Sequence, residues 1–111
     1  MPTVAKGLGQ AQPSDTNNYK IYTAEKGVSG KITSIFVCNV MNNRPRFRVF
    51  HSVKREDTQD TTTALFYDVR LSRRETLTLE FSIPFQEEDE FFVRTDTANE
   101  ITFTVYGEET T

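Results

Sequence analysis

The chain has 111 residues, of which 36% are hydrophobic and 26% are charged, and its net charge is −3. This composition is typical of one soluble globular domain and excludes a disordered chain or a membrane span, which needs about 20 consecutive apolar residues. The acidic balance gives no electrostatic reason to expect nucleic acid or a membrane as a partner.

Cysteine usage indicates a reducing environment. Cys38 is the only cysteine, so no intrachain disulfide can form, and a secreted fold held together by disulfides is excluded. The chain opens Met1-Pro2-Thr3 without an apolar run of signal-peptide length. We therefore expect synthesis and assembly in the cytoplasm.

The first eighteen residues predict an extended arm. They contain Gly7, Gly9 and Pro13, end in a polar run, and show no sustained hydrophobic periodicity. Strand patterns begin only at Tyr19. We expect an extended N-terminal arm over residues 1–18 and a folded domain over residues 19–111.

Short segments rich in β-branched and aromatic residues follow from Tyr19, separated by turn signals at the spacing of a sandwich or barrel. The expected strands are residues 19–23, 31–40, 47–53, 65–71, 76–83, 91–95 and 101–106. The clearest is 76–83, because apolar residues occupy every second position from Leu77 to Ile83. The centre of 31–40 is apolar on both alternating faces, which predicts a strand covered on both sides. The last two segments are expected to form an antiparallel hairpin across residues 96–99.

No segment shows a helical pattern of normal length. About seven strands with short polar connections predict an all-β fold of two packed antiparallel sheets. A jelly-roll-like β-sandwich is the architecture that we expect.

Residues capable of catalysis are few. Cys38 and His51 are each the only residue of their type, and both fall on the apolar pattern of predicted strands. A catalytic pair remains open, but a small buried thiol and a satisfied or interfacial imidazole are favoured, because nucleophilic catalysis also needs an orienting third group. Carboxylates such as Glu80 and Asp68 could also meet in space. We expect that the protein is not an enzyme.

No metal or cofactor is expected. The run Glu87-Glu88-Asp89-Glu90 lacks the alternate ligand spacing and the glycine of a calcium loop, and one His with one Cys cannot make a structural zinc site. We interpret the run as a solvated acidic loop. The segment Gly27 to Lys31 matches no phosphate-binding or dinucleotide motif and is interpreted as a turn.

Arginines cluster around the strand predicted at 47–53. Arg44 lies in the preceding turn, while Arg46, Arg48 and Phe50 share the outward set of that strand. Arginine next to an aromatic residue favours a protein interface. The alternative is an exposed edge strand that charge protects from unwanted pairing. Nucleic acid is less favoured, because interleaved aromatic residues are missing.

The two halves of the domain carry opposite charge. Residues 44–74 contain eight basic and four acidic side chains, whereas residues 75–109 contain ten acidic side chains and one arginine. Interleaved strands would cancel these charges. Otherwise the domain presents complementary patches, with Glu87, Glu88 and Glu90 on the acidic side, which suit a head-to-tail ring.

Short motifs are spread over nearly the whole chain. They are Leu8-Gly9-Gln10 with Pro13, Ile21-Tyr22-Thr23, Ile35-Phe36-Val37-Cys38-Asn39, Phe47-Arg48-Val49, Tyr67-Asp68-Val69 with Leu71, Glu75-Thr76-Leu77, and Ile101 to Glu108. In this order they resemble a family of small virion structural proteins of tailed bacteriophages. The chain departs from the family between Val40 and Arg46, where the family often has a turn of small residues.

The resemblance implies a non-enzymatic virion structural protein, first of all a capsid decoration or cement protein. Decoration proteins of this kind form trimers on local threefold sites, and their arms or loops hold the major capsid protein. The resemblance therefore implies a homotrimer in the virion that binds the major capsid protein or another virion protein, with Leu8, Gln10 and Pro13 of the arm as candidate contacts. The alternative is a tail, neck or fibre component, including a receptor- or carbohydrate-binding module with Tyr22, Tyr106 and Asp96 as sugar-site candidates.

Overall fold

Nested strand pairing organises the chain. The computed structural model describes residues 2–55 and 63–111, and its elements in chain order are β1 (Thr3–Ala11), β2 (Tyr19–Thr23), β3 (Ser29–Asn39), β4 (Arg46–Ser52), a 3-10 helix η1 (Val53–Arg55), β5 (Ala64–Arg70), β6 (Thr76–Phe85), β7 (Glu90–Thr95) and β8 (Ile101–Thr110). β1 pairs with β8, β2 with β7, β3 with β6 and β4 with β5, each pair antiparallel.

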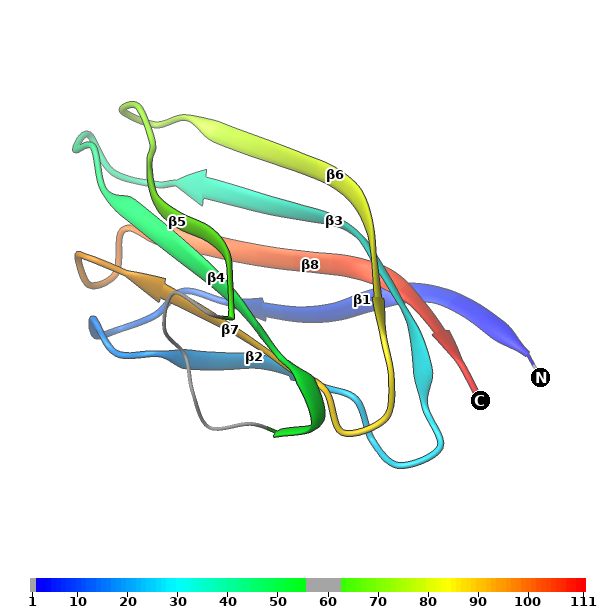
Figure 1. Cartoon of the computed structure of the whole chain (residues 1–111). Coiled ribbons are helices and arrows are strands. Elements are labelled where there is room, and N and C mark those ends of the chain that lie inside the picture. The colour runs from blue at the N-terminus through cyan, green and yellow to red at the C-terminus, as the bar shows by residue number, and fades with distance from the viewer. Residues whose placement is uncertain (1, 56–62) are drawn as a thin grey trace.

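Two further antiparallel pairs, β3 with β8 and β4 with β7, join the strands into two sheets, β1-β8-β3-β6 and β2-β7-β4-β5 (Figure 1). Two four-stranded antiparallel sheets with this nested order form a jelly roll. The predicted all-β sandwich is confirmed.

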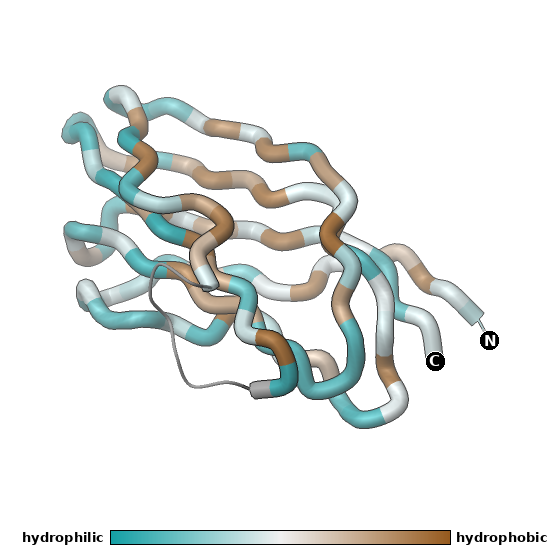
Figure 2. The backbone as a smooth tube through the Cα atoms, in the orientation of Figure 1, coloured by the Kyte–Doolittle hydropathy of each residue, from teal (hydrophilic) through white to brown (hydrophobic). Residues whose placement is uncertain are grey.

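The core lies between the two sheets. Phe47 of β4 and Phe103 of β8 are fully buried, and their rings meet edge to face across the sheets with centroids 5.9 Å apart. Apolar residues recur at alternate positions along several strands (Figure 2). Since successive side chains of a strand point to opposite faces, this alternation turns one apolar face of each sheet inward.

Residues 3–11, expected in an extended arm, form a strand of the sandwich. β1 pairs with β8 along its length, from Thr3 opposite Thr110 to Ala11 opposite Phe103. Glycine is required where β1 passes β2, because a Cβ atom on Gly9 would lie 2.3 Å from the carbonyl oxygen of Ile21. The expected arm over 1–18 is therefore corrected, since residues 3–11 belong to the first sheet.

The last two strands do not form the expected hairpin. β7 pairs with β2 and β4, whereas β8 pairs with β1 and β3, so the connection between them crosses from one sheet to the other. A short polar connection is compatible with either arrangement. The long-range pairing of β1 with β8 and β2 with β7 decides between them.

β3 is covered on one face only. Ile35 and Val37 are buried in the core, but Phe36 between them is 38% exposed. The expectation of a strand covered on both sides is wrong here, because the outer face of the β1-β8-β3-β6 sheet is open at this position.

Removing an inward ring tests this assignment of faces. We expect Phe103→Ala to lower the free energy of unfolding by about 3–5 kcal/mol, because it deletes a fully buried ring and leaves a cavity. Phe36→Ala, a matched change on the outer face, should cost about 1 kcal/mol or less. Urea denaturation of both variants measures this, and equal losses would contradict the assignment.

Candidate functional site

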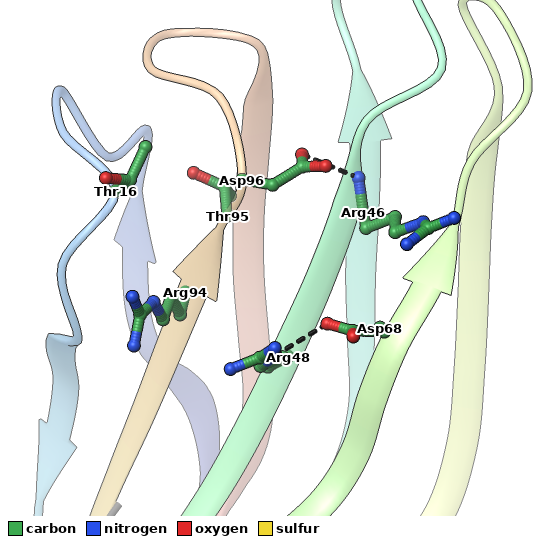
Figure 3. A pocket seen from close by; sticks show the side chains of 7 residues that line it. All are labelled: Thr16, Arg46, Arg48, Asp68, Arg94, Thr95 and Asp96. Carbon is green, nitrogen blue, oxygen red and sulfur yellow. Dashed lines mark hydrogen bonds and ion pairs between the residues drawn. The ribbon is translucent and has the colours of Figure 1, made fainter.

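The outer face of the β2-β7-β4-β5 sheet carries a hollow lined by arginines, which we call the arginine hollow. Arg46 and Arg48 come from β4 and Arg94 comes from β7 (Figure 3). The hollow has a volume of about 280 Å³. Its lining is completed by Thr16, Asp68, Thr95 and Asp96.

Strand pairing sets the spacing of Arg48 and Arg94. The register of β4 with β7 places these two residues directly opposite each other, and their neighbours Val49 and Val93 are also opposite and are buried in the core. Both arginines therefore point away from the core. Like charges directly opposite each other destabilise an antiparallel pair, so this position favours a nearby anion.

Arg48 forms an ion pair with the carboxylate of Asp68. Its Nε donates to Oδ1 of Asp68 at 2.7 Å, and its guanidinium carbon lies 4.0 Å from the ring centroid of Tyr67. Asp68 adopts a positive φ of 54° where the register between β4 and β5 shifts. The hydrogen bond from Arg48 lowers the pKa of Asp68, and the charges of Arg48, Arg46 and Arg94 lower it further.

Among the described residues, no carboxylate forms such a pair with Arg46 or Arg94. Oδ1 of Asp96 accepts a hydrogen bond from the backbone N–H of Arg46 at 2.9 Å, which ties this carboxylate to the main chain. Across the described ranges, no ion pair joins a carboxylate to the guanidinium of Arg46 or Arg94. Three arginines face two carboxylates, Asp68 and Asp96, in the lining, so the hollow keeps an excess of positive charge and can bind a carboxylate or another oxyanion.

The predicted arginine cluster is only partly reproduced. Arg46 and Arg48 line the hollow, but Arg44 lies in the loop before β4 and is exposed outside it. Phe50 is 1% exposed, so its ring is not available to a partner, although alternation places it on the outer side of the sheet with Phe92 opposite. The edge-guard alternative is wrong, because β4 lies between β7 and β5.

The other lining residues were not expected in this site. Arg94 alternates with the buried residues Val93 and Thr95, so its outward direction could be read from the sequence. What the sequence does not reveal is that β7 lies next to β4. The same applies to Thr16 and Asp96, which reach the site from connections between strands.

The three motif residues of the N-terminal segment have different environments. Gln10 is exposed, and its amide donates to Oγ1 of Thr104 at 3.2 Å. Leu8 packs against the core, and Pro13 is buried with its carbonyl oxygen accepting from the N–H of Asn99. Of the three, only Gln10 has an exposed side chain.

The acidic run is not one solvated loop. Glu87 is exposed and Glu88 is half-buried with a φ of 70°, but Asp89 is 3% and Glu90 is 6% exposed. Glu90 forms an ion pair with Lys20 at 2.9 Å, so its proposed role at an interface is corrected. Only the first two acids of the run remain accessible to a partner.

Asp89 joins the β6–β7 turn to the end of β4. Its Oδ1 accepts from the backbone N–H of Lys54 at 2.9 Å, and its Oδ2 accepts from that of Gln86 at 3.0 Å. Nε2 of His51 lies 3.0 Å from Oδ2, and the imidazole stacks on Phe91 with centroids 4.3 Å apart. His51 is therefore a satisfied imidazole in the structure.

The reactive candidates do not come together. Cys38 lies opposite Thr76 and Thr102 in the first sheet and is half-buried, whereas His51 belongs to the second sheet. Glu80 of β6 and Asp68 of β5 also lie in different sheets. Within residues 2–55 and 63–111, no three His, Cys, Asp or Glu side chains gather as metal ligands, and no helix is long and apolar enough to cross a membrane.

Three loop arginines and the first two glutamates of the acidic run lie at opposite ends of the sandwich. Arg44 lies in the β3–β4 connection and Arg73 and Arg74 lie in the β5–β6 connection, whereas Glu87 and Glu88 follow β6 at its other end (Figure 1). Ten residues of β6 separate these ends by roughly 33 Å. Each end also carries an exposed charge of the other sign, because Glu75 follows Arg74 and Lys54 lies beside the β6–β7 turn, where its backbone N–H donates to Asp89.

The contacts of Asp89 with Lys54, Gln86 and His51, which we call the Asp89 clamp, predict that the loss of this one carboxylate strongly lowers stability. Asp89→Ala should lower the free energy of unfolding by about 2–4 kcal/mol, because it leaves two backbone N–H groups and an imidazole without their acceptor. The control Glu87→Ala, in the same turn but exposed, should cost less than about 0.5 kcal/mol. Equal stability of the two variants in urea denaturation would contradict the clamp.

The same carboxylate predicts a loss of stability in acid. Burial alone would raise the pKa of Asp89, but hydrogen bonds from Lys54, Gln86 and His51 outweigh it and hold the pKa below its ordinary value. The unfolded chain has an ordinary pKa of about 3.9 and binds the proton first, so stability falls as the pH drops below about 4 toward the folded-state pKa.

Unfolding free energies between pH 5 and pH 3 measure this effect. We expect a steeper fall for the native chain than for Asp89→Asn, which has no carboxylate to protonate at this position. Identical slopes would assign the acid sensitivity to other groups.

Comparisons with known proteins return no relative: no family model, no curated protein and no solved structure matches the chain. The resemblance to tailed-bacteriophage virion proteins therefore rests on the short motifs alone. The arginine hollow is the feature of the structure from which a function can be argued.

Proposed function

We propose that the protein is a non-enzymatic virion structural protein of a tailed bacteriophage, and that it binds the major capsid protein as a capsid decoration protein. The observation that carries the binding role is the arginine hollow, in which Arg46 and Arg94 form no ion pair with a carboxylate of the described residues. The order of the sequence motifs supplies the virion context. The separation of Cys38 from His51, whose ring is held by Asp89, supports a role without catalysis.

Acidic side chains of the partner dock in the hollow. A guanidinium presents its N–H donors in a planar fork that matches the two oxygens of a carboxylate. Arg94 is half-buried on a paired strand, so its backbone is already fixed before binding. The hydrogen bond to Asp68 positions Arg48, which lies opposite Arg94, and the hydroxyl of Thr16 adds a further donor to the lining of the hollow.

A homotrimer is part of this proposal. Exposed arginines and exposed glutamates at opposite ends of the sandwich favour a head-to-tail contact between copies, and such contacts make a ring when the rotation closes. Repetition around the particle then lets modest individual contacts stabilise the shell. The β2-β7-β4-β5 face remains available for the capsid.

The arginine hollow can be tested without the natural partner. A hexaglutamate peptide should bind the native protein at low ionic strength, and Arg94→Glu should weaken the binding at least tenfold, because it removes the unpaired cation and adds a repelling charge. Arg73→Glu changes the net charge equally in a loop outside the hollow and should retain most of the affinity. NMR titration of the arginine side chains measures both. Equal weakening by both substitutions would indicate only a response to net charge.

The location is tested on particles. A cryo-EM map of bacteriophage particles that contain the chain should show threefold clusters of the sandwich on the shell, with the arginine hollow toward the capsid. Density only at the neck, tail or fibre would replace decoration with that location. Tight binding of the isolated protein to a DNA oligonucleotide through Arg94 would contradict a protein partner.

A further inference from the structure

The middle of the outer face of the β1-β8-β3-β6 sheet carries little charge, and the ion pair of Lys31 with Glu108 lies toward one end of this face. Register sets the outward residues of its two central strands side by side, and these are Thr102, Thr104 and Tyr106 of β8 with Cys38, Phe36 and Ser34 of β3. Of the residues that pair with them on β6, only Glu80 is charged. Hydroxyl, amide and aromatic groups therefore make up this face, in contrast with the arginine hollow on the other sheet.

Two exposed aromatic rings lie at the centre of the face. Phe36 is 38% and Tyr106 is 44% exposed, and their rings meet edge to face with centroids 5.8 Å apart. The two rings therefore form one continuous apolar surface that solvent reaches. Such a pair contributes little to the core, because both rings lie on the outer side of the sheet.

A hollow of about 300 Å³ adjoins Tyr106. It is lined by Gly7, Leu8, Gly9, Gln10, Thr104 and Tyr106. A Cβ atom on Gly7 would lie 3.8 Å from Cε1 of Tyr106, so the absence of a side chain leaves the flank of this ring open. This volume is at the lower end of the range for small-molecule sites.

One pair of amide and hydroxyl groups lines this hollow, and a second pair lies farther along the same sheet. Nε2 of Gln10 donates to Oγ1 of Thr104 at 3.2 Å, and Nε2 of Gln12 donates to Oγ1 of Thr102 at 3.1 Å. Each pair retains a carboxamide oxygen, a second amide proton and a hydroxyl proton that can face a ligand. Gln10 belongs to β1 and Gln12 follows its end, so the two pairs form a row of donors and acceptors beside β8.

We propose that this face binds a neutral oligosaccharide, with one sugar ring against Tyr106 and its hydroxyls on Gln10 and Thr104. Sugar hydroxyls both donate and accept, as the amide and hydroxyl groups here require, and the C–H groups of a sugar pack on the negative face of an aromatic ring. A flat apolar partner would bury the amide groups without new hydrogen bonds, which is unfavourable. An anionic ligand would find its counter-charge on the opposite sheet.

This inference goes beyond capsid binding and does not depend on it, because the two sites lie on different sheets. Isothermal titration calorimetry with maltohexaose, cellohexaose and chitohexaose tests it on the full chain. We expect at least one of the three to bind with a millimolar or lower Kd. Tyr106→Ala should weaken that binding at least tenfold, whereas Tyr106→Phe should retain most of it because the ring remains.

Tyr19→Ala is the matched control, since Tyr19 is also 44% exposed but belongs to the other sheet, and it should leave binding unchanged. Gly7→Val provides a second, steric test. A Cβ atom at this position makes only ordinary contacts with Tyr106, so we expect the melting temperature to hold while the filled hollow loses its ligand.

The proposal is overturned if none of the three oligosaccharides binds the native protein. It is also overturned if Gly7→Val, shown to be folded by its melting temperature, binds as the native chain does. Loss of binding in Arg94→Glu with full binding in Tyr106→Ala would move the sugar to the arginine hollow and reject this face.

Discussion

The register of β4 against β7 is the constraint on which the candidate site depends. It places Val49 opposite Val93 inside the core and Arg48 opposite Arg94 outside it. A slip of one residue in either strand would turn its arginine toward the core and expose its valine. The apolar core therefore enforces the close approach of two cations on the outer face. Repulsion between them is tolerated because burial of the alternate residues on the same strands stabilises the pair.

A second constraint acts where β6 turns into β7. The carboxylate of Asp89 accepts hydrogen bonds from two backbone segments and contacts the imidazole of His51, which itself stacks on a core ring. This one side chain connects the β6–β7 turn with the start of η1 and with β4. The acidic composition of the turn therefore has two causes, because Glu87 is solvated while Asp89 is structural. A run of like charges does not reveal this division.

Strand directions were accessible from the sequence, but strand neighbours were not. Alternation predicted the inward direction of Phe47 and Val49 and the outward direction of Arg46 and Arg48, but it failed at the end of β4, where Ser52 is buried and Val53 is exposed. The pairing of β7 with β4 joins residues that lie far apart in the chain. No local sequence pattern therefore predicts that Arg94 or Asp96 belongs to the site. β1 escaped prediction for a different reason, because Gly9 is dictated by the approach of the Ile21 carbonyl and leaves no apolar alternation. Phe50 shows the limit of alternation itself, which gives the side of the sheet but not whether that side is covered.

The two outer faces differ more than folding requires. Packing density restricts which residues fit between the sheets, but it places no such restriction on residues that point outward. One outer face nevertheless collects three arginines around a hollow, and the other collects amides, hydroxyls and two exposed rings in contact. Exposed rings gain little from folding when the unfolded chain exposes them as well, and opposed arginines oppose folding. The stability of the sandwich alone therefore does not account for the composition of either face, and for this reason we propose a binding role for both.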